Sequence, residues 1–178
     1  MTRHELLDNI THKDLRIHPR YVAGCGFDQQ LARVFPIELG ALQAEYPLFF
    51  TRNPDTEQYD LVALLGFEND ENLYLSDGGW QARSLPLTIE RQPFLIGFDQ
   101  AGASNPVIHV DMDHPSVGQD EGEPVFLPHG GESALLERMN QVLGQIHEGH
   151  QASEALSRTL SGMDLIESLN LEVSFINE

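Results

Sequence analysis

The chain has 178 residues, with 28 acidic against 10 basic side chains and a formal net charge of −18. A negative field of this size repels phosphate backbones and anionic lipid surfaces, so we expect neither nucleic acid nor a membrane as a partner. Hydrophobic residues at 40% and charged residues at 21% are typical of a soluble globular protein. A chain of this length fits one domain, which buries roughly 70% of its unfolded surface.

The single cysteine and the N-terminal residues indicate the cellular compartment in which we expect the protein. Cys25 has no second cysteine to pair with, which excludes an internal disulfide and a cysteine-rich metal site. The first residues carry charges throughout and include no apolar run of signal-peptide length. No apolar run approaches the ~18 residues that a membrane-spanning helix requires. We therefore expect a cytoplasmic protein.

The N-terminal part of the chain is mostly polar. Residues 1–14 are predicted to form a polar arm. The alternation around Leu15 and Ile17 predicts a short edge strand that ends before Pro19. Apolar residues at helical spacing after Pro36 predict a short helix.

Residues 46–112 carry most of the strand signal and are predicted to form the β core. Two hairpins are expected, one around the turn at residues 53–55 and one around residues 77–79, because Pro and Gly there supply the backbone angles of turns. Two further strands follow before residue 112. Short links between consecutive strands indicate an antiparallel sheet of about five to seven strands.

The C-terminal part of the chain is predicted to be mainly helical. The acidic, Pro- and Gly-rich residues 113–131 are expected to form a loop. Apolar residues recur at helical spacing over 132–162, with an end or interruption expected at Gly149. Alternation over 171–176 predicts a final strand. The predicted fold class is therefore α+β, one domain with C-terminal helices packed on one face of the sheet.

Several short motifs, occurring in one order, carry a family resemblance. They are Y-P-L-F-F from Tyr46, V-A-L-L-G from Val62, N-L-Y-L from Asn72, G-W from Gly79, R-Q-P-F from Arg91 and G-E-P-V-F from Gly122. On these motifs the chain resembles the SapC family of bacterial proteins. Members usually continue past the position of Phe175, so the chain resembles a short member, natural or truncated, that lacks the family's C-terminal segment.

The resemblance implies an accessory role. SapC-like proteins are often encoded near outer-membrane receptors, halogenase-like enzymes and cupin-type oxygenases, and the family offers no established catalytic residues to carry over. We therefore expect a non-enzymatic accessory or binding protein that has a protein or peptide partner and needs no cofactor. Assembly into a homo-oligomer stays open.

Four residues of the predicted β core are candidate binding residues. Trp80 and Tyr74 are aromatic residues of the kind enriched at interfaces, although core packing explains them equally well. Arg83 and Arg91 flank a short turn, where each could bind a ligand carboxylate or pair with an internal glutamate. Internal pairing is favoured, because partly buried arginines usually have acidic partners.

The competing hypothesis is a metal-dependent enzyme. His109 and Asp111 form a His-x-Asp pattern at the end of a predicted strand, where period-2 spacing directs both side chains to one face. With the distal His129 they would complete the two-histidine, one-carboxylate Fe(II) site of an oxygenase-like enzyme. The same alternation fits a half-exposed strand whose polar face meets solvent. The sequence leaves enzymatic activity open and favours a binding protein.

Overall fold

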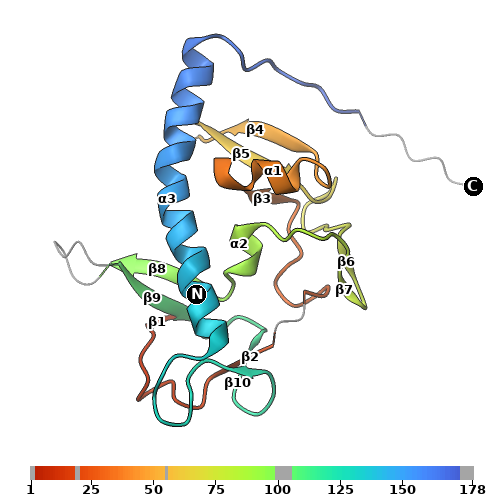
Figure 1. Ribbon diagram of the computed structural model, residues 1–178. Coiled ribbons are helices and arrows are strands. Elements are labelled where there is room, and N and C mark those ends of the chain that lie inside the picture. Colours follow the sequence, from red (N-terminus) through yellow and green to blue (C-terminus); the bar gives the residue numbers. More distant parts are fainter. Residues whose placement is uncertain (1–2, 19–20, 55, 99–105, 173–178) are drawn as a thin grey trace, which may run out of the picture.

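The computed structural model describes residues 3–18, 21–54, 56–98 and 106–172 (Figure 1). Within these ranges the strands form four small antiparallel sheets, and one long helix, α3, runs beside them. The α+β class predicted from the sequence is confirmed. The strands are divided among several sheets, however, and do not form one sheet of five to seven strands.

Two three-stranded sheets form the main β units. One has the order β1-β9-β8, with the bounds His4–Leu6, Pro106–Asp111 and Phe94–Phe98. The other has the order β3-β5-β4, with the bounds Leu31–Arg33, Tyr59–Leu64 and Leu48–Arg52. The chain between β5 and β8 forms a small hairpin and a helical turn and adds no strand to either unit, so the two units stay separate.

The remaining elements are short. A third sheet has the order β10-β2-β11, with the bounds Val117–Gly118, Arg16–Ile17 and Glu123–Pro124. The hairpin pairs β6 (Leu75–Ser76) with β7 (Gly79–Trp80). The short helices are η1 (Pro36–Glu38), α1 (Leu39–Leu42) and α2 (Leu87–Glu90).

Three local predictions change in the structure. Residues 4–6, predicted as part of a polar arm, form β1 and pair with β9. The strand at Arg16–Ile17 is central and not at an edge, because β10 and β11 pair with it on both sides. These two strands lie inside residues 113–131, so the predicted loop contains paired backbone. Residues 173–176 of the predicted final strand lie outside the described residues, and residues 171 and 172 are not in a strand.

Helix α3 (Ala134–Gly162) continues through Gly149, so the expected interruption there is wrong. The Ser133 hydroxyl caps its start by accepting the Leu136 backbone N–H at 3.2 Å. Gly149 is buried, and a Cβ atom built on it would lie 2.7 Å from the Phe35 ring. The helix therefore tolerates glycine at this position because Phe35 occupies the space of the missing side chain.

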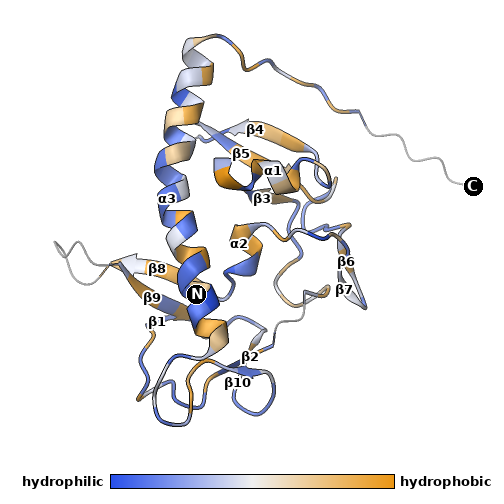
Figure 2. Ribbon diagram, viewed as in Figure 1, coloured by the Kyte–Doolittle hydropathy of each residue, from blue (hydrophilic) through white to orange (hydrophobic). Residues whose placement is uncertain are grey.

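The core consists of two hydrophobic clusters. The first lies between α3 and the β1-β9-β8 sheet and includes Phe35, Leu87 and Phe94. The second lies under the β3-β5-β4 sheet and includes Phe27 and Ile89. Figure 2 shows apolar residues concentrated in β4, β5 and β9 and recurring in bands along α3. Helix α2 joins the clusters, because Leu87 belongs to one and Ile89 to the other.

A buried carboxylate fixes the junction between the clusters. Glu38, which is 8% exposed, accepts the backbone N–H of Phe35 through Oε2 and that of Leu87 through Oε1, both at 2.8 Å. Burial raises the pKa of Glu38, against the lowering effect of these two hydrogen bonds. The side chain thereby holds the start of η1 against the start of α2.

We expect Gly149→Ala to destabilise the protein by up to about 2 kcal/mol. Overpacking against Phe35 costs about 1–3 kcal/mol, and the gain in helix propensity of about 1 kcal/mol offsets only part of it. Gly144→Ala is the matched control, because Gly144 lies in the same helix with nothing within 4 Å of its added Cβ. Urea denaturation should show a small stabilisation for the control. Equal effects of the two variants would contradict the packing role of Gly149.

Glu38→Ala should destabilise the protein by roughly 2–5 kcal/mol, because it leaves two buried N–H groups without an acceptor. Glu45 provides the control, since its carboxylate also accepts two backbone N–H groups, those of Arg83 and Ser84. That site is open to solvent, so water replaces the lost acceptor in Glu45→Ala and the loss is smaller. Thermal and urea unfolding compare the two variants, and a larger loss for Glu45→Ala would refute the argument.

Candidate functional site

The predicted aromatic pair comes together, but its polar atoms are used within the fold. The rings of Tyr74 and Trp80 stack with centroids 6.0 Å apart. Trp80 Nε1 donates to the Tyr46 hydroxyl at 2.7 Å, and the Tyr74 hydroxyl donates to the Glu45 carbonyl at 2.9 Å. Both rings pack at the edge of the second cluster. In this structure they attach the β6–β7 hairpin to the core, and a binding role for them stays a prediction.

Neither predicted arginine forms an ion pair with a carboxylate among the described residues. Backbone hydrogen bonds, helped by the charge of Arg83, nevertheless lower the pKa of the Glu45 carboxyl group, so the expected internal pairing is wrong for Arg91 only. Glu90, the neighbour of Arg91 in sequence, instead accepts two hydrogen bonds from Arg138 of α3, at 2.7 and 2.9 Å. The Glu45 carboxylate accepts hydrogen bonds from backbone N–H groups, including that of Arg83. Arg83 is exposed, whereas Arg91 is partly buried, and the two line different cavities.

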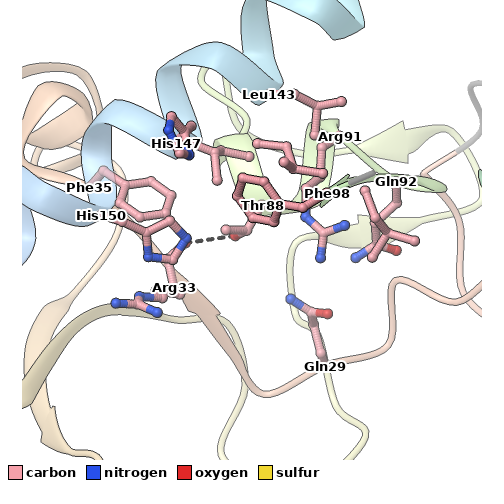
Figure 3. Close-up of a pocket in the computed structure, with 13 residues that line it drawn as sticks. Gln29, Arg33, Phe35, Thr88, Arg91, Gln92, Phe98, Leu143, His147 and His150 are labelled. Atoms are coloured by element: carbon pink, nitrogen blue, oxygen red, sulfur yellow. Dashed lines mark hydrogen bonds between the residues drawn. The ribbon is translucent and has the colours of Figure 1, made fainter. Parts of the chain in front are cut away.

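Arg91 lines a cavity of about 480 Å³ between α3, α2, β3 and β8 (Figure 3). We call this cavity the donor pocket. Its described polar lining residues all carry hydrogen-bond donors, and none of them is an aspartate or glutamate: they are Gln29, Arg33, Thr88, Arg91, Gln92, His147 and His150. Its apolar lining residues are Phe35, Leu95, Ile96, Phe98, Leu143 and Ile146. In a chain of net charge −18, a cavity with two arginines and no carboxylate is suited to an anionic group.

Arg33 lies at one side of the donor pocket, and its positive charge is balanced by Asp60. Its Nη2 lies 2.7 Å from Asp60 Oδ1, and its guanidinium carbon lies 5.8 Å from the centroid of the Phe35 ring. Its Nε is buried without a hydrogen-bond partner. The Thr88 hydroxyl donates to the Arg33 carbonyl at 2.6 Å, which ties β3 to α2. Arg33 therefore forms part of the frame of the pocket.

Arg91 differs from Arg33 because its charge has no opposite charge beside it among the described residues. Its Nη1 donates to the Phe94 carbonyl at 2.7 Å, which orients the guanidinium. Burial lowers the pKa of Arg91 because it disfavours the charged form, but a guanidinium remains protonated in proteins. The remaining guanidinium N–H groups are available to a ligand.

The two histidines of the pocket lie one helical turn apart on α3. The His150 ring contacts Phe35 with centroids 5.1 Å apart, and the His147 ring lies 6.3 Å from that of Phe98. Burial, followed by the charge of Arg33, lowers the pKa of His150. At neutral pH His150 is therefore mainly uncharged, and it adds a donor to the pocket without a full positive charge.

A second depression, of about 660 Å³, lies on the β3-β5-β4 sheet, and we call it the sheet groove. Phe49, Val62 and Leu64 line it from the sheet, and residues 165–171 line it from the chain after α3. Three leucines of that segment are more than half exposed: Leu165, Leu169 and Leu171. The groove is therefore largely apolar and open to a partner.

Strand β4 forms a free edge beside the sheet groove. The Leu64 N–H bonds to the Pro47 carbonyl and the Asn53 N–H to the Gln58 carbonyl. In the antiparallel register, these two bonds place Phe49 and Thr51 at the alternate positions whose backbone N–H and C=O groups bond to β5. The backbone N–H and C=O groups of Leu48, Phe50 and Arg52 therefore point away from β5, and no described residue pairs with them.

The predicted iron ligands are not assembled. His109 and Asp111 do share one face of β9, but the His109 ring packs over Gly97 of β8, where a Cβ would meet it. Asp111 Oδ1 accepts the Asp113 N–H at 3.1 Å. His129 lies exposed in the loop before α3. Within the described part of the chain, no group of three or more His, Cys, Asp or Glu side chains could hold a metal ion.

Comparison with known proteins agrees with the resemblance found in the sequence. The described residues define an α+β protein that includes the donor pocket, the sheet groove and an edge at β4 that no described strand covers. The family model described as SapC matches residues 7–178, so the chain belongs to the SapC family. No curated protein and no solved structure matches it. No helix in the described ranges is both long and apolar enough to cross a membrane.

Sequence reasoning found Arg91 but not the pocket around it. The lining residues come from segments around residues 29–35, 88–98 and 143–150, which are far apart in the chain. The available signal was the pair His147 and His150, three residues apart on a predicted helix. It does not indicate which other segments face that side of the helix.

We expect Fe(II), added anaerobically to protein purified without chelator, to leave the thermal unfolding temperature unchanged. The three predicted ligands His109, Asp111 and His129 are not grouped, so no binding free energy is available to stabilise the fold. Asp111→Asn is the matched variant, since it removes one predicted ligand at nearly constant volume. An iron-dependent rise in unfolding temperature that is absent in Asp111→Asn would restore the oxygenase hypothesis.

Proposed function

We propose that this SapC-family chain is a non-enzymatic accessory protein of the cytoplasm that binds an extended segment of a protein partner along β4. The observation that carries the proposal is the edge of β4, where no described residue pairs with the backbone groups of Leu48, Phe50 and Arg52. An extended peptide adds to such an edge through main-chain hydrogen bonds, while its side chains at alternate positions provide specificity.

The properties of this edge favour recognition of a partner. Natural edge strands are usually protected by a central proline, a bulge, inward-pointing charges or a covering segment. Strand β4, with the sequence L-F-F-T-R, has no proline, and its one charged residue, Arg52, is exposed at the end. Partner residues on the groove side would lie beside Phe49, so we expect them to be apolar at every second position.

The net charge of the chain limits the kind of protein segment that we expect as the partner. The chain carries a net charge of −18, so an acidic segment would be repelled on approach, whereas a neutral or basic one would be attracted. This favours a protein segment with few carboxylates and argues against nucleic acid or an anionic membrane surface. No cofactor is needed for binding of this kind.

A second copy of the chain is the other occupant that the same edge allows. Two β4 strands related by a two-fold axis would pair antiparallel and form a continuous sheet across a homodimer. We favour a different protein as the partner, because two chains that each carry a charge of −18 repel one another.

Arg52→Pro tests the proposal directly. Proline removes the outward N–H of residue 52 and no hydrogen bond to β5, so the fold should tolerate it at this edge. Arg52→Ala is the control, because it removes the side chain but keeps the N–H. We expect a partner captured by wild type to be retained at least tenfold less by Arg52→Pro and nearly normally by Arg52→Ala.

Hydrogen exchange of the backbone amides identifies the surface that binds the partner. Partner binding should slow exchange of the amides of Leu48, Phe50 and Arg52, while those of Phe49 and Thr51 are already protected by β5. Size-exclusion chromatography over a range of concentrations reports a homodimer, which would replace the partner proposal if Arg52→Pro dissociated it. Capture unaffected by Arg52→Pro, or protection elsewhere on the surface, would overturn binding at β4.

A further inference from the structure

We propose that the donor pocket binds a small organic monocarboxylate with an apolar body, and that Arg91 binds the carboxylate. This site is separate from the β4 edge and does not depend on the proposed partner. The residues concerned lie on α2, α3, β3 and β8 and in the segment before β3.

The charge of Arg91 is not balanced by any carboxylate of the described residues. Taking a guanidinium out of water is costly unless an anion or several acceptors compensate it. Arg91 has one described acceptor, the Phe94 carbonyl, and no ion pair. The nearby Glu90 is bound to Arg138 by two hydrogen bonds and does not serve Arg91. A carboxylate placed against the free N–H groups would supply the missing opposite charge, with the two-point geometry that a guanidinium favours.

Several hydrogen-bond donors surround Arg91. Figure 3 shows the Arg91 guanidinium and the Gln29 side-chain amide turned toward the same space. The Gln92 Oε1 contacts His114 Nε2 at 3.1 Å, which leaves the Gln92 NH₂ group as a donor. The described lining residues include no carboxylate that would repel a bound anion.

The positive charge of the pocket favours a ligand with a single negative charge. Arg33 is already paired with Asp60 at 2.7 Å, and His150 is mainly neutral at pH 7. Arg91 is thus the strong positive charge in the lining that a ligand can use. One positive charge balances a monoanion, so a carboxylate fits better than a phosphate monoester or a dicarboxylate, each of which would carry a second charge into the pocket.

The apolar lining of the pocket favours a ligand with an apolar body. Six apolar side chains form the rest of the wall, from β8 (Leu95, Ile96 and Phe98), from α3 (Leu143 and Ile146) and from the start of η1 (Phe35). Phe98 is 61% exposed, so part of this apolar wall still faces solvent. A cavity of roughly 150 Å³ holds benzene, and the donor pocket has about 480 Å³. An aromatic or branched aliphatic acid, larger than benzoate, therefore fits.

The test uses 4-phenylbutyrate as the probe, with its neutral amide and phenyl phosphate as matched comparisons, measured by titration calorimetry and by NMR shift mapping. We expect the acid to bind at least tenfold more tightly than the amide and than phenyl phosphate. Shifted resonances should include those of Arg91, Phe98 and His147, and Arg52→Pro should bind the acid as wild type does.

Two arginine variants test whether Arg91 is the residue that binds the carboxylate. Arg91→Gln should weaken binding of the acid at least tenfold and leave binding of the amide unchanged. Arg83→Gln, at an exposed arginine outside the donor pocket, should leave both unchanged. If Arg91→Gln does not fold, the proposal is tested by comparing the affinities of the acid and the amide for the wild-type protein. The proposal is overturned if the acid does not bind at millimolar concentration, if the amide or the phosphate binds equally well, or if Arg83→Gln has the larger effect.

Discussion

The packing of Phe35 into the space left by Gly149 is the contact on which the rest of the structure depends. Phe35 is fully buried, and its backbone N–H is held by Glu38, which also holds the start of α2. With the Phe35 ring packed against it, α3 runs past both β units, contacting β5 and β8, and covers the first cluster. The same ring forms part of the wall of the donor pocket, so the stability of the fold and the shape of the pocket rest on one residue.

The distribution of charge follows from how α2 meets α3. Because Glu90 faces Arg138 of α3, Arg91, the next residue in sequence, is left without an acidic partner among the described residues. The turn after α2 then places Arg91 in a cavity, where the Phe94 carbonyl orients it. An ion pair on one side of a short helix thus leaves a free cation on the other side, in a protein whose surface is otherwise strongly negative.

The two candidate sites differ in the kind of interaction they offer. The β4 edge offers backbone hydrogen bonds beside an apolar groove, which suits an extended protein segment. The donor pocket offers one charge and a ring of donors and apolar side chains, which suits a small acid. Both are bordered by elements that pack on α3 or η1, so ligand binding at either site would stabilise the same fold.

The sequence by itself determined the α+β class, the family, the strands around residues 48–64 and 94–111 and the helix after Ser133, because periodicity and turn residues are local signals. It also singled out Arg91. Tertiary structure decided that Gly149 lies inside one continuous helix, that the strands divide into several sheets and that Arg91 has no acidic partner among the described residues. These outcomes depend on which distant side chain fills a given space, such as Phe35 at Gly149 or Arg138 at Glu90, and local pattern carries no information about that.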